Sequence, residues 1–343
     1  MDKKQIIWSK APLRLGLAGG GTDVSPYSET NGGCVLNSTI NLYAYSVIEP
    51  RNDKKIVFES YDLGYREEYK LNEKIDSSGP LCLLKGVYNH IIEKYNIDYS
   101  SFKLSTFVDA PPGSGLGTSS TLVVSILGNF AEWFGLALGE YEIAHESYII
   151  ERINLGMSGG KQDQYAATFG GFNFMEFSDG DKVIVNPLRI RQNLINTLEI
   201  SLILCHLGKS RYSSKIIEDM TKNMNEGNSI SLKALDIVKE QAIAMKEAIL
   251  TENMIKFSQI MNEGWLNKKK VAKQISNSRI DKFYELALSS GAMAGRVSGA
   301  GGGGFMLFFC DPRKRYSVIK ALEGEGGLVR PYKFVKEGLE VWR

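Results

Sequence analysis

A glycine-rich loop that leads straight into an apolar helix is the strongest constraint on this chain. Residues 111–120 read Pro-Pro-Gly-Ser-Gly-Leu-Gly-Thr-Ser-Ser, and apolar residues then recur every fourth position, at Leu122, Ile126, Phe130 and Phe134. This spacing predicts a helix over 121–135 with one buried face. The free N–H groups and the dipole at the start of such a helix attract phosphate, and glycine lets the backbone come close to it.

The loop differs from the two commonest nucleotide-binding motifs. No lysine follows Gly117, so it is not a Walker loop, and Thr118 stands where a dinucleotide fingerprint needs its third glycine. The hydroxyl groups of Thr118, Ser119 and Ser120 are suited to donating to phosphate oxygens or to binding a magnesium ion. A plain glycine-rich turn with a Ser/Thr helix cap is the alternative interpretation.

Composition excludes several classes of protein. A chain of 343 residues suggests about two domains, and a net charge of +2 gives no case for a nucleic-acid or membrane partner. The four cysteines lie far apart and form no CxxC pair, so neither a zinc site nor a disulfide framework is expected. No signal peptide is visible, and we expect a cytoplasmic protein.

Alternating and helical spacings predict the elements of the chain. The predicted strands are 5–18, 34–48, 54–60, 102–108, 169–177 and 200–206. The predicted helices are 81–95, 121–135, 141–154, 213–224, 229–250, 253–273 and 280–289, with Lys268–Lys270 expected on a solvated face. The tail 305–341 is expected to form strand, helix and strand, and the polar stretch 187–197 is expected to be irregular. Without a regular βαβ repeat, the order favours an α+β fold.

Two further glycine motifs flank this loop. In the first, a predicted strand ends in Gly19, Gly20 and Gly21, followed by Thr22 and Asp23, whose side chains suit hydrogen bonds to sugar hydroxyls. A tight turn with an Asp cap is the alternative. In the last, residues 298–305 contain GxGxxG, but an apolar strand follows, so the dinucleotide interpretation fails its context test. Four consecutive glycines indicate backbone packed close to a ligand or to another loop.

Two carboxylates lie between these motifs. Glu151 falls on a predicted helix, and Asp163 follows the glycine-rich turn at 156–160. A carboxylate in such a turn can face a substrate hydroxyl, and one on the preceding helix can hold a metal. Surface exposure is the alternative for either acid, because it is the commonest position of Asp and Glu.

The three motifs, in this order and spacing, resemble the GHMP kinase superfamily over nearly the whole chain. The Ala-Gly-Gly-Gly-Thr-Asp form of the first motif resembles bacterial D-glycero-D-manno-heptose 7-phosphate kinases and also fucokinase-type domains. Segments 159–167 and 208–214 fit the heptose kinase group best. Galactokinases have an acidic residue and a histidine where this chain has Gly20 and Gly21, which argues against galactose.

The resemblance implies an α+β fold of two domains with the active site between them. Residues 1–195 would form an N-terminal domain of the ribosomal-protein-S5 type, and residues 196–343 a ferredoxin-like C-terminal domain. The oligomeric state does not follow from the sequence.

The resemblance also implies roles for individual residues. Asp163 would face the attacking hydroxyl with Arg14 beside it, and Ser119 and Glu151 would hold Mg²⁺. The residues implied to wrap the ATP phosphates are Pro112, Gly113, Ser114, Gly115, Leu116, Gly117, Thr118, Ser119 and Ser120. The residues implied to bind the sugar phosphate are Gly19, Gly20, Gly21, Thr22, Asp23, Lys161, Lys209, Arg211, Gly301 and Gly302.

The activity implied is ATP-dependent phosphorylation of the anomeric hydroxyl of D-glycero-D-manno-heptose 7-phosphate to the 1,7-bisphosphate. The basic residues Lys161, Lys209 and Arg211 are candidates for gripping the phosphate already on that substrate, with an ordinary charged loop as the alternative at 208–214. The other functions left open are a GHMP kinase for another sugar such as L-fucose, a mevalonate- or homoserine-type kinase, and a non-catalytic sugar sensor. The Gly-Gly-Gly-Thr-Asp motif speaks against the second, and the presence of Asp163, Ser119 and Glu151 against the third.

Overall fold

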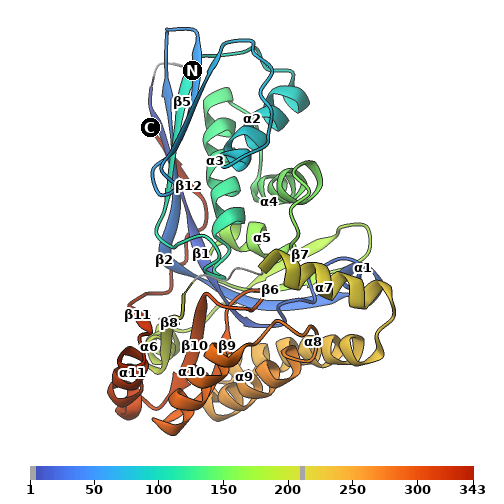
Figure 1. Cartoon of the computed structure of the whole chain (residues 1–343), viewed down its shortest axis with the longest axis vertical. Coiled ribbons are helices and arrows are strands. Elements are labelled where there is room, and N and C mark those ends of the chain that lie inside the picture. Colours follow the sequence, from blue (N-terminus) through green and yellow to red (C-terminus); the bar gives the residue numbers. More distant parts are fainter. Residues whose placement is uncertain (1–4, 209–212) are drawn as a thin grey trace.

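The computed structural model describes residues 5–208 and 213–343. Its larger sheet is mixed and is built around two long strands, β1 and β2 (Figure 1). Its main path runs β12-β1-β2-β5-β3-β4, with β6 and β7 continuing from β2. The strands are β1 (Ile7–Ala18), β2 (Gly33–Pro50), β3 (Lys55–Ser60), β4 (Tyr65–Lys70), β5 (Phe102–Val108), β6 (Phe172–Phe177), β7 (Val183–Pro187) and β12 (Glu340–Trp342).

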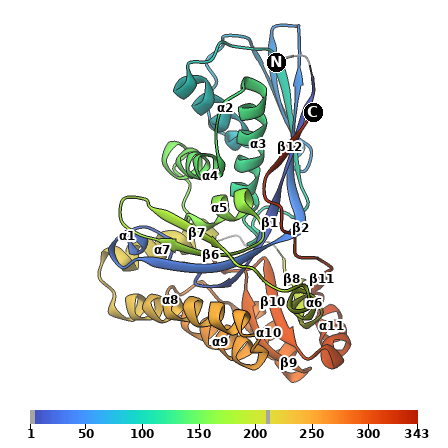
Figure 2. The same cartoon turned by 180° about the vertical axis from the view of Figure 1, so that it is seen from behind.

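Helices cover one face of this sheet, as the two opposite views show (Figures 1 and 2). They are α2 (Cys82–Tyr95), α3 (Thr118–Phe134), α4 (Glu140–Tyr148) and α5 (Gln162–Phe169), and a π-helical segment, Ile149–Asn154, continues α4. The four-residue helix α1 (Tyr27–Thr30) precedes β2 and lies apart from this layer. Helix α3 is buried along most of its length, and its apolar side chains share a core with α2, β3 and β5. The sequence predicted this central helix from its apolar period, and the structure confirms it.

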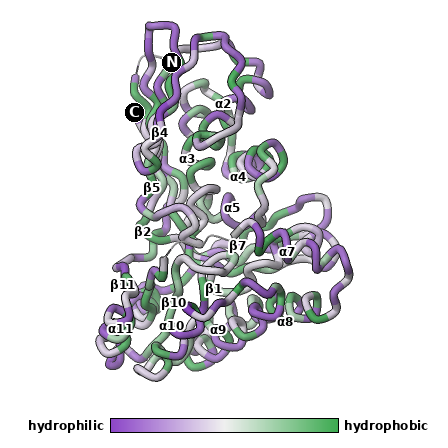
Figure 3. The backbone as a smooth tube through the Cα atoms, in the orientation of Figure 1, coloured by the Kyte–Doolittle hydropathy of each residue, from purple (hydrophilic) through white to green (hydrophobic). Residues whose placement is uncertain are grey.

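A second, antiparallel sheet carries the remaining helices, in the order β11-β8-β10-β9. Its strands are β8 (Leu202–His206), β9 (Ala292–Val297), β10 (Phe305–Cys310) and β11 (Leu328–Arg330). The helices are α6 (Gln192–Ser201), α7 (Ser213–Asn225), α8 (Ser229–Leu250), α9 (Met254–Lys268), α10 (Ser278–Ser289) and α11 (Arg315–Gly324). Helix α8 alternates hydrophobic and hydrophilic residues along its length, as expected for a helix that packs on one face (Figure 3).

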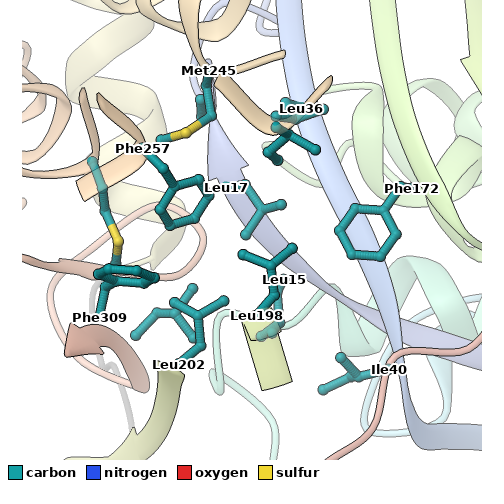
Figure 4. Packing of buried hydrophobic residues seen from close by; sticks show 14 of the residues in the cluster. Leu15, Leu17, Leu36, Ile40, Phe172, Leu198, Leu202, Met245, Phe257 and Phe309 are labelled. Atoms are coloured by element: carbon teal, nitrogen blue, oxygen red, sulfur yellow. The ribbon is translucent and has the colours of Figure 1, made fainter. Parts of the chain in front are cut away.

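One hydrophobic core joins the two sheets (Figure 4). Leu15 and Leu17 from β1 meet Met245 of α8, Phe257 of α9 and Phe309 of β10 in this cluster. The end of β1 that leads into the first glycine motif is therefore held against the second sheet. This packing fixes how the glycine motifs from distant parts of the sequence approach one another.

Several sequence predictions need correction. The stretch 187–197 is not irregular throughout, because α6 begins at Gln192 and buries Leu194, Ile195 and Leu198 at helical spacing. The helix predicted over 253–273 ends at Lys268, and the strand predicted from residue 200 begins at Leu202. The short elements α5, β4, β7 and β9 were not predicted, because each is too brief to show a clear period.

The C-terminal tail returns to the first sheet. Strand β12 pairs antiparallel with β1, with Trp342 opposite Trp8. The division of the chain into two domains at residue 195 stays a prediction. The last strand of the predicted C-terminal domain, β12, is part of the first sheet. Over residues 5–208 and 213–343, no helix combines the length and the apolar character needed to cross a lipid bilayer.

Candidate active site

The three glycine motifs and the π-helical segment line one cavity of about 450 Å³. The cavity lies where the end of β1, the start of α3, the start of α5 and the loop before β10 come together. The charged residues that line it are Arg14, Asp23, Glu151, Arg152, Asp163, Glu218, Lys268 and Arg296. The arrangement is therefore a polar cleft built from residues far apart in the sequence.

The glycine-rich loop before α3 is fixed from two sides. Gly113, Gly115 and Gly117 all adopt left-handed backbone angles, with φ of +75°, +78° and +80°. A Cβ on Gly115 would lie 2.4 Å from the carbonyl oxygen of Ser298, so the last glycine motif packs directly on this loop. On the other side, the Arg14 backbone N–H donates to the carbonyl of Leu116 at 3.1 Å. The loop is thus preformed at the N-terminus of a buried helix, which is an anion-binding geometry.

Arg14 and Asp163 form the central ion pair of the cleft. Arg14 Nε and Nη2 lie 2.7 and 2.6 Å from Asp163 Oδ1, and Arg14 Nη1 donates to the Gly115 carbonyl at 2.6 Å. A Cβ on Gly117 would lie 3.2 Å from Asp163 Cγ, so the carboxylate borders the end of the glycine-rich loop. The predicted partners are therefore together, and Asp163 lines the cavity beside the loop.

Glu151 sits in the π-helical segment with only 1% of its surface exposed. Ser119 Oγ donates to its Oε1 at 2.6 Å, Gln164 Nε2 donates to its Oε2 at 2.7 Å, and Arg152 Nη1 lies 3.1 Å from Oε1. The structure thus brings together the two predicted metal ligands. A hydroxyl and a carboxylate oxygen are the donor types that Mg²⁺ prefers, and this ion usually takes phosphates and water as its other ligands.

Asp23 is buried in the wall of the same cavity, and its side chain accepts three hydrogen bonds. Its Oδ1 accepts from the Gly21 backbone N–H at 3.0 Å and from Gln162 Nε2 at 3.1 Å, and its Oδ2 accepts from the Gln162 backbone N–H at 3.2 Å. A Cβ on Gly160 would lie 2.0 Å from Oδ2, so glycine is required for this approach. Gly20, Gly21 and Asp23 line the cavity as predicted.

Other predicted residues fall outside the cavity wall. Gly19 and Thr22 pack on the backbone of Cys34, and Gly301 and Gly302 pack against Ile275, while Gly299 and Ala300 line the cavity instead. The Lys161 ammonium is buried between Glu29 and Asp181, at 2.6 Å from each carboxylate, and the geometry argues against a role in gripping substrate. Lys209 and Arg211 lie outside the described residues.

Two buried cations of the cavity wall were missed by sequence reasoning. Lys268 was expected on a solvated face, but only 3% of it is exposed; Arg296 on β9 is 4% exposed. A signal for Lys268 existed, because it follows the buried Trp265 by three positions and Met261 by seven, on the inner face of α9. Burial, with the nearby Arg296 and Arg14 guanidinium groups, lowers the pKa of Lys268 to about 7, against the opposing influence of Asp23 and Asp163.

The fold and this site define a class of small-molecule phosphotransferases with a glycine-rich phosphate loop. Family models for the GHMP kinases N terminal domain and the GHMP kinases C terminal domain match residues 83–171 and 245–327. The chain belongs to the GHMP kinase family. This membership confirms the expected two-domain α+β GHMP kinase fold, and it makes the protein an ATP-dependent phosphotransferase.

Individual relatives are similar over the whole chain. The chain is 47% identical over 339 residues to D-glycero-alpha-D-manno-heptose 7-phosphate kinase from Campylobacter jejuni, covering 99% of each sequence. A solved structure called D-glycero-D-manno-heptose 1-phosphate kinase, from Bacteroides thetaiotaomicron, matches with a TM-score of 0.85 and 44% identity over 98% of this chain and 99% of that one. L-fucokinase/L-fucose-1-P guanylyltransferase from Bacteroides fragilis is 27% identical over 93% of this chain and 36% of its own length.

Proposed function

We propose that the protein transfers the γ-phosphoryl group of ATP to the anomeric hydroxyl of D-glycero-D-manno-heptose 7-phosphate, which gives the 1,7-bisphosphate. The observation that carries this proposal is that Asp163, which borders the glycine-rich loop at Gly117, lines the same cavity as Asp23 and the first glycine motif. The 47% identity to a heptose 7-phosphate kinase supports the choice of acceptor. Because the donor is ATP, we place the reaction in the cytoplasm.

On the donor side, the loop Pro112–Ser120 would wrap the ATP phosphates. Because its glycines carry no side chains, the ATP phosphates can come close to the backbone of the loop. The positive end of the helix dipole, at the N-terminus of α3, adds to the attraction. Ser119 and Glu151 fit Mg²⁺, which when bound would neutralise charge on the β- and γ-phosphates. The Glu151 carboxylate is held in place by Gln164 at one oxygen and by Arg152 at the other.

At the reacting end, Asp163 would accept the hydrogen of the attacking hydroxyl. The Arg14 guanidinium holds one carboxylate oxygen through two N–H groups, which restrains the orientation of the carboxylate. A carboxylate fixed in this way acts on a hydroxyl either as general base or as a hydrogen-bond acceptor that orients it. Phosphoryl transfer depends mainly on this kind of positioning.

On the acceptor side, Asp23 and the Gly20–Gly21 backbone would bind sugar hydroxyls. Gln162 holds Asp23 in place through both its backbone and side-chain N–H groups. The absence of side chains at Gly20 and Gly21 leaves room for a bulky sugar beside this carboxylate. The wall is therefore suited to a polyhydroxylated acceptor.

The test is an ADP-release assay over a panel of acceptors: D-glycero-D-manno-heptose 7-phosphate, the heptose 1-phosphate, free heptose, L-fucose and mevalonate. We expect the highest kcat/KM with heptose 7-phosphate, and ³¹P NMR of the product should show a new phosphate on the anomeric carbon. Preference for L-fucose or for the 1-phosphate would replace the proposed acceptor. Turnover of mevalonate alone would contradict the sugar kinase assignment.

A further inference from the structure

We propose that Lys268 and Arg296 form the subsite that binds the phosphate already carried by the acceptor. This inference rests on the proposed function, because it assumes a sugar phosphate as substrate. It assigns the task to two residues of the second sheet and its helices, rather than to Lys161 or to the segment 208–214.

The first argument is the missing counter-charge. Among the ion pairs of residues 5–208 and 213–343, each of the other cavity-lining arginines has a carboxylate partner: Arg14 pairs with Asp163 and Arg152 with Glu151. Among those described residues, neither Lys268 nor Arg296 forms an ion pair with a carboxylate. A buried cation without a partner is unfavourable, and binding an anion removes the penalty.

The second argument is unused hydrogen-bonding capacity. Lys268 Nζ donates to the Gly299 carbonyl at 2.5 Å, which leaves other ammonium hydrogens for a ligand. Arg296 Nη1 donates to the Leu17 carbonyl, while its Nε is buried with no hydrogen-bond partner in the described part of the chain. Both side chains are more than nine-tenths buried and both line the cavity. An ammonium and a guanidinium together match the oxygens of a phosphate.

The third argument is position on the acceptor wall. A Cβ built on Gly20 would lie 3.5 Å from Lys268 Nζ and 3.6 Å from Gln162 Nε2, so the ammonium borders the first glycine motif and the residue that holds Asp23. The donor phosphates already have the loop Pro112–Ser120, the α3 N-terminus and the Ser119–Glu151 pair. Arg296 donates to the carbonyl of Leu17, on the strand end that leads into the same glycine motif. Both cations therefore lie beside the first glycine motif, which the proposed function assigns to the acceptor.

The charges around Lys268 agree with this assignment. Arg14 on β1 and Arg296 on β9 repel the ammonium, while Asp23 and Asp163 attract it, and the net result with burial is a pKa lowered to about 7. A phosphate dianion placed beside the ammonium would favour its charged form. An anion bound here would therefore offset the repulsion among Lys268, Arg14 and Arg296.

The experiment compares Lys268→Met with Lys270→Met in steady-state kinetics. Lys270 is exposed near the end of the same helix, so its variant controls for the loss of a lysine. We expect Lys268→Met to raise KM for heptose 7-phosphate by about tenfold to a hundredfold, the range for a lost charge-assisted contact, with KM for ATP within about twofold of wild type. Lys270→Met should match wild type in both constants.

Thermal unfolding of the ligand-free variants separates binding from a structural role. Because Met fills the space of the lysine chain without its buried charge, Lys268→Met should keep or raise Tm. A lower Tm or loss of folding would mean that the ammonium serves the fold, and it would contradict the proposal. An increase in KM for ATP alone would assign the pair to the donor.

Failure of the inference and failure of the proposed function are distinguishable. If wild type does not turn over heptose 7-phosphate, the proposed function is wrong. If wild type does so and Lys268→Met keeps the same KM for it, the proposed function stands and the subsite is elsewhere, with Arg211→Ala as the next variant to measure.

Discussion

The two sides of the cavity differ in how their buried cations are neutralised. On the donor side, Glu151 is satisfied by Ser119, Gln164 and Arg152, and the phosphate loop is locked by contacts to β1 and to Ser298. On the acceptor side, Lys268 and Arg296 are buried without carboxylate partners among the described residues. The donor side is preorganised by contacts within the protein, whereas the acceptor side is left to be completed by its substrate.

The comparison suggests how specificity arises in such an enzyme. Transfer of a phosphoryl group from ATP makes the same demands on the donor site whatever the acceptor is, so the donor site can be built as a self-contained unit. The acceptor side must distinguish substrates, and unsatisfied buried groups penalise every ligand that fails to satisfy them. The predictions below test this contrast, beginning with the residue that lies between the two sides.

The largest effect is expected for Asp163, which both sides share. Asp163→Asn should lower kcat by roughly 10²–10⁴-fold, because it removes a positioned proton acceptor. Binding of ATP, measured by calorimetry, should be close to that of wild type, since the loop does not depend on this carboxylate. A folded Asn variant with near-normal kcat would remove Asp163 from the reaction.

On the donor side, Ser119→Ala and Glu151→Gln should each raise the Mg²⁺ concentration that gives half-maximal rate, by roughly tenfold for loss of one oxygen ligand or its charge. The double variant should lose less than the product of the single effects, because both side chains serve one ion. KM for the sugar phosphate should change little. Independent, multiplicative losses with unchanged Mg²⁺ dependence would count against a shared ion.

On the acceptor side, pH should act through Lys268. Its pKa of about 7 in the empty site means that the ammonium is charged below that pH and loses its proton above it. Affinity for the phosphorylated acceptor should therefore weaken as pH rises above 7, by up to about tenfold per unit. Measured from pH 7 to 9, the rise in KM for heptose 7-phosphate should be present in wild type and lost in Lys268→Met. An identical pH profile in both proteins would refute this linkage.

The smallest kinetic effect is expected for Lys161, the buried cation that already has partners. Lys161→Met should lower the free energy of unfolding by about 1–3 kcal/mol, because Glu29 and Asp181 lose their counter-charge. KM for the sugar phosphate should stay within about twofold of wild type. A large increase in that KM, in a protein of normal stability, would return Lys161 to the acceptor site as the sequence first suggested.

The sequence indicated more of the cavity-lining residues on the donor side than on the acceptor side, and the reason is physical. Residues 111–120 and α3 are contiguous, so loop chemistry and helical period reveal them together. The Arg14–Asp163 and Ser119–Glu151 contacts needed the family resemblance, because their partners are far apart in the chain. Nothing local shows that Lys268 and Arg296 converge, since α9 and β9 are brought to β1 only by the core shared between the sheets.

The charge pattern of the sequence also gave wrong predictions for two lysines that the fold buries, Lys268 and Lys161. Three consecutive lysines at 268–270 are typical of a solvated face, yet Lys268 lies on the inner face of α9 while Lys270 is exposed. Lys161 shows the converse, because a basic residue in a glycine-rich turn suggested a phosphate contact and the fold supplies it with two carboxylates instead. Residue type alone does not distinguish a cation that awaits a ligand from one that is already neutralised.

The central claim is that the acceptor side is completed by the substrate's own phosphate. The most direct measurement is the ratio of kcat/KM for heptose 7-phosphate to that for unphosphorylated heptose, in wild type and in Lys268→Met. The account predicts a strong preference for the phosphorylated sugar in wild type that falls by about tenfold to a hundredfold in the variant. The same ratio in both proteins would contradict it.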